Sequence, residues 1–125
     1  MGLAGRISLS AARLEVVRRQ LTTRERAVLD ALLSVEFNGV EDLRCQAKTA
    51  AVLGECDCGC ASIDFHNESG VGMQVRVNAA IEGTYDGLFL YTVGGQLGGI
   101  EWVGVSDGGD PAEFPDPDVL TIRPA

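Results

Sequence analysis

The sequence has few basic residues after its first fifty positions. Residues 51–125 carry two bases, Arg76 and Arg123, against twelve acids, and the whole chain has a formal net charge of −8. An acidic surface repels the phosphate backbone of nucleic acids. The composition therefore argues against sequence-independent nucleic-acid binding. It is typical of a surface that favours solubility, or of a face for a basic protein partner.

Long hydrophobic runs are also absent. No stretch approaches the roughly eighteen consecutive apolar residues of a membrane-spanning helix. The N-terminal "MGLAGRISLSAARLEVVRRQ" lacks the apolar core of a secretory signal, because arginines interrupt each apolar run. We therefore expect no membrane partner and a cytoplasmic location, where thiols stay reduced.

The sequence lacks the motifs of common enzymes. It contains no Gly-x-Ser-x-Gly elbow, no P-loop, no Rossmann fingerprint and no internal repeat. Asp64 and His66, two residues apart on one predicted strand face, could form a general-base pair, and a solvated polar face is the alternative. His66 is the only histidine.

The chain length of 125 residues fits one domain, which we place at residues 21–125. Residues 1–20 are predicted to be an extension or a weak amphipathic helix over residues 8–20. The sequence "TTRE" predicts a capping box at the start of a helix over residues 23–37, and "NG" at 38–39 supplies its stop. A second helix is predicted from about Val40 to Lys48.

From residue 50 onward the apolar residues alternate with a period of two, which is typical of strands. Helices followed by strands indicate an α+β fold. We predict two N-terminal helices packed on one face of a four- to five-stranded antiparallel sheet, with the strand at 87–93 in its centre. The proline-rich tail is expected to run extended along the surface.

The predicted strand at 87–93 is apolar on both faces, so its second face needs a cover. We expect a homodimer formed through this second sheet face, or a chain segment lying over it, either residues 1–20 or residues 111–122. A large bare apolar patch is rare on monomers.

Three cysteines, Cys56, Cys58 and Cys60, occupy alternate positions in "ECDCGCAS". On a straight strand they would lie roughly 7 Å apart, too far to share one ion. Gly59 permits a bend, and three interpretations then remain: apolar packing at a tight turn, a zinc or other soft-metal site, and a redox site.

Zinc requires four ligands. His66 would lie about 20 Å from Cys60 along one strand, so it cannot join the ion unless the chain doubles back. Cys45, Asp57 or a second subunit would then have to supply the fourth ligand. A thioredoxin-like redox site needs C-x-x-C at a helix start, and acidic neighbours raise thiol pKa values.

Residues 21–65 resemble a group of small uncharacterised actinobacterial-type proteins. That group has a helix opening Leu-Thr-x-Arg-Glu, a Phe-x-Gly turn, Leu-Arg-x-Gln, and a Cys-Gly-Cys-x-Ser-Ile-Asp strand. The matching residues are Leu21, Thr22, Arg24, Glu25, Phe37, Gly39, Leu43, Arg44, Gln46, Cys58, Gly59, Cys60, Ser62, Ile63 and Asp64. The resemblance implies a shared fold over about residues 21–120 and no function.

These observations favour a small acidic cytoplasmic protein-interaction module without catalysis. The first alternative is a zinc-binding module using Cys56, Cys58 and Cys60. The second alternative is an enzyme using Asp64 and His66.

Overall fold

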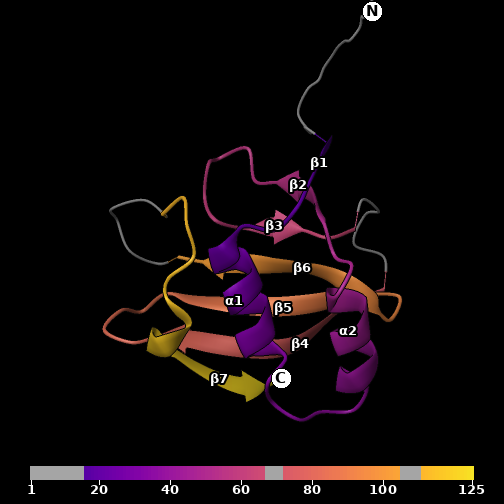
Figure 1. Ribbon diagram of the computed structural model, residues 1–125. Helices are drawn as coiled ribbons and strands as arrows, with labels where there is room; N and C mark the ends of the chain where they lie inside the picture. The colour runs from indigo at the N-terminus through magenta and orange to yellow at the C-terminus, as the bar shows by residue number, and fades with distance from the viewer. Residues whose placement is uncertain (1–15, 67–71, 105–110) are drawn as a thin grey trace, which may run out of the picture.

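The structure, a computed structural model, describes residues 16–66, 72–104 and 111–125, with side chains from Arg18 onward. It is an α+β fold in which two helices lie over one face of a seven-stranded antiparallel sheet (Figure 1). The elements in chain order are β1 (Val16–Arg19), α1 (Thr23–Leu32), α2 (Val40–Ala47), β2 (Val52–Glu55), β3 (Ile63–Asp64), β4 (Met73–Ile81), β5 (Gly87–Val93), β6 (Gln96–Val103), the 3-10 helix η1 (Pro117–Val119) and β7 (Leu120–Pro124). The predicted fold class is confirmed, and the sheet has more strands than the four or five predicted.

The first helix begins where the sequence predicts and ends earlier. The side chain of Thr22 accepts a hydrogen bond from the amide of Glu25, whose carboxylate accepts one from the amide of Thr22. The helix ends at Leu32 because the amide and hydroxyl of Ser34 both donate to the carbonyl of Ala31, which competes with a further helical turn. The prediction of a helix to residue 37 is therefore wrong.

The prediction that Asn38 and Gly39 end the first helix is also wrong, because Gly39 is the N-cap residue of the second helix. It has a φ of 93°, which favours glycine, and it immediately precedes α2. In α2 the buried side chains are Val40, Leu43 and Ala47, as the apolar spacing predicts. Neither helix, within the part of the chain described, is long and apolar enough to cross a membrane.

The sheet order is β1-β2-β3-β6-β5-β4-β7, so only β4, β5 and β6 form a simple meander. Strand β5 lies inside the sheet between β6 and β4, as predicted. The predicted strand that carries Asp64 and His66 is short, because only Ile63 and Asp64 pair with both β2 and β6. Residues 16–19 form edge strand β1, so the helix predicted over residues 8–20 is wrong where the structure describes it.

The two faces of the sheet differ in their cover. Leu88 and Leu90 of β5 are buried beneath the helices, while Phe89 and Tyr91 on the second face remain partly exposed. The tail does not cover that second face. Phe114 is only 1% exposed within the same core as the helices, and its carbonyl accepts from Nη1 of Arg24 on α1. The prediction that residues 111–122 cover the second face is therefore wrong, and residues 1–15 lie outside the described chain.

Candidate metal site

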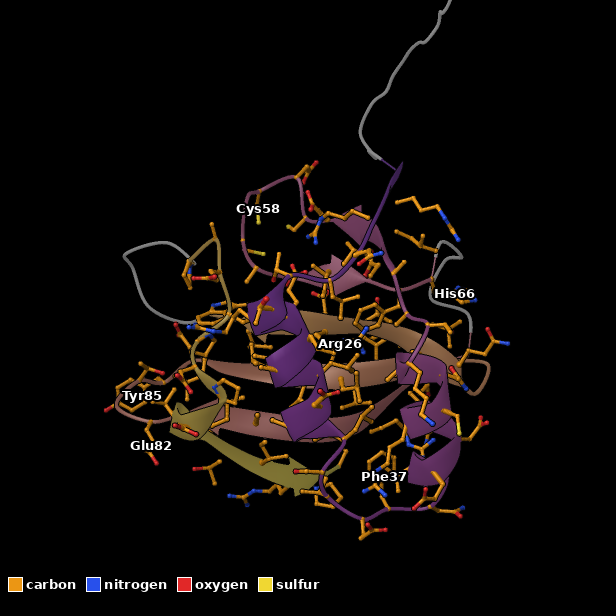
Figure 2. The ribbon with its side chains drawn as sticks, in the orientation of Figure 1. Arg26, Phe37, Cys58, His66, Glu82 and Tyr85 are labelled. Carbon is orange, nitrogen blue, oxygen red and sulfur yellow. The ribbon has the colours of Figure 1, made fainter. Side chains whose placement is uncertain are left out.

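The three clustered cysteines lie on the loop that joins two paired strands. Strand β2 ends at Glu55, which pairs with Ile63 of β3, so residues 56–62 leave the sheet and return to it within one hairpin. Because this pairing holds the two ends of the short loop together, the loop curls between them (Figure 2). The cysteines are therefore brought together by strand pairing some residues away from them.

The loop begins with a tight turn. The amide of Gly59 donates to the carbonyl of Cys56 at 3.1 Å, and Gly59 has a φ of 89°. This left-handed conformation is one that glycine adopts without penalty. The bend that Gly59 permits is present, and the turn spans Cys56 to Gly59.

The turn brings the three sulfurs together. The Sγ atoms of Cys56, Cys58 and Cys60 all lie within 4.8 Å of one another, and those of Cys56 and Cys58 are 2.7 Å apart. The amide of Cys60 also donates to Sγ of Cys58. A tetrahedral ion about 2.3 Å from each sulfur would hold the sulfurs about 3.8 Å apart. The sulfurs of Cys56 and Cys58 would have to move apart by about 1 Å to hold such an ion.

The far end of the loop is anchored by Ser62. Its hydroxyl accepts from the amide of Trp102 on β6 at 2.8 Å, and the thiol of Cys60 lies 3.4 Å from the same oxygen. Ala61 and Ile63, on either side, are buried in the core. The third sulfur is thus held just before the start of β3.

The thiols are not part of the hydrophobic core. Cys58 is exposed, Cys56 and Cys60 are partly buried, and none belongs to the core cluster. The interpretation of these cysteines as compact apolar residues packed beside the helices is therefore wrong. Cys45 is exposed on α2 and lies outside the group, so it does not supply a fourth ligand.

The neighbouring thiol of Cys58 favours the protonated form of Cys56. The hydrogen bond with Cys58 raises the pKa of Cys56 to about 12, and burial and the proximity of Cys60 act in the same direction. A metal ion would have to displace this proton, as it does at thiolate sites generally. The cluster also follows a strand and not a helix start, so it lacks the dipole that activates a redox thiol.

A small cavity of about 140 Å³ adjoins the thiols. Arg19, Glu25 and Glu55 line it together with Cys56 and Cys60. Arg19 reaches both carboxylates, with Nη1 2.8 Å from Glu25 and Nη2 2.7 Å from Glu55. No sequence pattern indicates this neighbourhood, because Arg19 and Glu55 meet only through the pairing of β1 with β2.

The residues of the predicted general-base pair do not meet around a cavity. Asp64 accepts a hydrogen bond from the hydroxyl of Tyr91 at 2.7 Å, beside glycines of the second sheet face. His66 lines a cavity together with Gln46 and Phe65, and Asp64 is not part of the lining of that cavity. Figure 2 also shows His66 on the opposite side of the molecule from Cys58, so His66 does not join the thiols.

Comparison with family models, curated proteins and solved structures finds no match for this chain. The resemblance of residues 21–65 to the small actinobacterial-type proteins therefore stays a prediction. The candidate site has to be judged on its geometry alone.

Proposed function

We propose that this protein binds a soft divalent metal ion, zinc in particular, through Cys56, Cys58 and Cys60. The supporting observation is the convergence of three sulfurs within 4.8 Å on a solvent-accessible loop. Thiolates are the ligands that zinc and other soft ions prefer. Within the described residues no fourth His, Cys, Asp or Glu joins the group, so water or an external thiol completes the tetrahedron.

The chain offers a matched pair of cysteines for the test. Cys58 and Cys45 are both exposed, but only Cys58 belongs to the cluster. We expect tag-free protein to hold one zinc per chain by elemental analysis. Cys58→Ser should lose that stoichiometry, and Cys45→Ser should retain it.

Metal removal gives a second readout. Zinc present at a thousand times its dissociation constant stabilises the folded chain by about 4 kcal/mol, so a chelator should lower the melting temperature of the zinc-loaded protein. Cobalt should give thiolate-to-metal charge-transfer absorption that Cys58→Ser abolishes. A chain that takes up no stoichiometric metal and melts at the same temperature with and without chelator would refute the proposal.

A second function, self-association through the second sheet face, is supported by one row of residues across the sheet. Glu101, Phe89, Asn78 and Arg123 are cross-strand neighbours on β6, β5, β4 and β7. Glu101 and Arg123 therefore lie three strand spacings apart, roughly 14 Å. Neither forms an ion pair with another described residue.

This row is complementary to itself. A two-fold axis along the strands, between β5 and β4, places Glu101 of one copy opposite Arg123 of the other, and it does so twice. Phe89 and the 45% exposed Val103 would be covered in the same contact. Such an isologous pairing is the commonest arrangement of homodimers.

Sedimentation and light scattering test the association. Arg123→Glu should dissociate the dimer by placing two acids opposite each other, and so should Glu101→Arg. The double variant restores both pairs in the opposite sense and should dimerise again. A wild-type chain that stays monomeric at all concentrations, or a double variant no better than the single ones, would contradict this second proposal.

A further inference from the structure

A large cleft in the described part of the chain is lined by basic residues. It measures about 690 Å³, within the usual range for small-molecule sites, and lies between β1, the start of α1 and the end of α2. Four cations line it, namely Arg18, Arg19, Arg26 and Lys48, and no acid does. The whole chain has 18 acids and 10 bases, so its composition alone does not explain why bases gather in this cleft.

Three of these cations have no carboxylate partner among the described residues. Arg19 bridges Glu25 and Glu55, but Arg18, Arg26 and Lys48 form no ion pair there. Nη1 of Arg26 donates to the carbonyl of Ala47, which leaves the other guanidinium donors unused by this contact. Figure 2 places Arg26 between α1 and α2. Of these three cations, Arg26 is positioned by a hydrogen bond, and Arg18 and Lys48 are exposed.

The backbone amides in the first turn of α1 do not themselves form an anion-binding site. Thr22 and Glu25 satisfy each other's first-turn amides through the capping box. The attraction for an anion comes from the side chains, with the hydroxyls of Thr23 and Thr49 also lining the cleft. Cationic side chains and hydroxyls are the groups that bind phosphate oxygens in proteins.

A second cavity continues from the basic cleft; Arg18 is its only arginine or lysine, and Gln46, Gln96 and Leu97 also line it. It measures about 230 Å³, shares Arg18 and residues 49–51 with the cleft, and adds Leu53, Phe65 and His66 to its lining. A ligand that spans both would place a charged end among the cations and a flat or apolar body against Phe65. An extended polyanion would leave the second cavity unused.

We propose that this composite cleft binds a small phosphorylated molecule. Its phosphate lies among Arg18, Arg26 and Lys48, and its apolar or aromatic body lies against Leu53 and Phe65. This site is separate from the thiol cluster, since the two cavities contain none of the three cysteines. Its test is therefore independent of metal binding.

Calorimetric titration of the full chain with phenyl phosphate and with inorganic pyrophosphate, at constant ionic strength, tests the proposal. Arg18→Gln and Lys48→Gln change exposed side chains and should each weaken both ligands roughly tenfold, as expected for a lost hydrogen bond to a charged group. Gln74→Glu is the charge-matched control, because it lowers the net charge equally at an exposed position outside both cavities. It should leave binding unchanged.

The contribution of the second cavity has its own variant. Leu53→Asn adds no charge beside Arg18, so it should weaken phenyl phosphate and leave pyrophosphate binding in place. Three results would overturn the proposal: binding no tighter than that of chloride, equal weakening by Gln74→Glu, or a single-stranded oligonucleotide that binds more tightly than phenyl phosphate. The last result would assign the basic cleft to nucleic acid instead.

Discussion

Thr22 and Glu25 determine where the first helix begins. Each side chain satisfies the other residue's backbone amide, at 3.1 Å and 2.9 Å. Such reciprocal bonds replace the partners that first-turn amides lack within a helix. The start of α1 is thus fixed by residues three positions apart in sequence.

Thr22→Ala should lower the free energy of unfolding by about 1 kcal/mol, because it removes the capping oxygen. Urea denaturation measures the change. Thr23→Ala is the control, since this neighbouring hydroxyl is also exposed and makes no hydrogen bond found in the described structure. Equal effects of the two substitutions would contradict the capping role.

Gly99 is a residue with no room for a side chain. A Cβ at this position would lie 2.5 Å from the carbonyl oxygen of Ile63 and 2.8 Å from the hydroxyl of Tyr91. The first contact is with backbone in a paired strand, which cannot move away without breaking the β3–β6 pairing. This close approach lets the bond between Tyr91 and Asp64 lie flat on the sheet.

Gly99→Ala should therefore destabilise the fold by about 2 kcal/mol or more, as overpacking does in cores. Gly54→Ala is a graded comparison, because its Cβ would meet the movable carboxylate of Asp64 at 3.1 Å. We expect a smaller loss there. Chemical denaturation of both variants checks the order, and a Gly99→Ala chain as stable as Gly54→Ala would disprove the argument.

At the scale of elements, the C-terminal tail is part of the core. Its proline-rich sequence predicts an extended surface segment, but β7 pairs along the edge of β4 from Leu120 to Pro124. Phe114, before it, packs against the core on the helix side. The tail therefore links α1, through Phe114, to the edge strand β7 of the sheet.

Phe114→Ala should cost about 3–5 kcal/mol, the usual loss for a buried aromatic side chain. Tyr85→Ala provides the control, because Tyr85 is 93% exposed and Phe114 is 1% exposed. We expect a large fall in melting temperature for the first variant and almost none for the second. A tail that only lay on the surface would give two small effects.

At the scale of the whole molecule, Arg19 connects three elements. From β1 it binds Glu25 on α1 and Glu55 on β2, and those hydrogen bonds raise its own pKa. Burial alone would raise the pKa of Glu25, but hydrogen bonds from Arg19 and Thr22 outweigh burial and lower it. The edge of the sheet is therefore joined to the helix layer by an ionised carboxylate.

This connection predicts a pH dependence. Because the folded chain binds the Glu25 proton more weakly than the unfolded chain, its stabilisation is complete above the unfolded pKa, about 4.3. It is lost as the pH falls through the lower folded pKa. Glu25→Gln keeps the capping geometry and removes the charge. Unfolding free energies measured from about pH 7 to about pH 3 should fall more steeply for the wild type, and parallel curves would contradict this prediction.

The sequence alone determined the features that depend on neighbouring residues. The capping box at Thr22, the apolar stripe of α2, the turn at Gly59 and the interior position of β5 all follow from spacing within a few residues. One local pattern failed at β4. A bulge between Val75 and Val77 interrupts the regular alternation of β4, and Met73, before the bulge, is 44% exposed.

Only the tertiary structure decided how distant segments meet. The sulfurs converge because β2 and β3 close the loop between them, and the basic cleft forms because the end of α2 lies beside β1 and the start of α1. Phe114 is buried because β7 pairs with β4. Periodicity and capping depend on bonds between near neighbours, whereas strand order depends on which far segments bury the most apolar surface together, and spacing along one sequence does not record that choice.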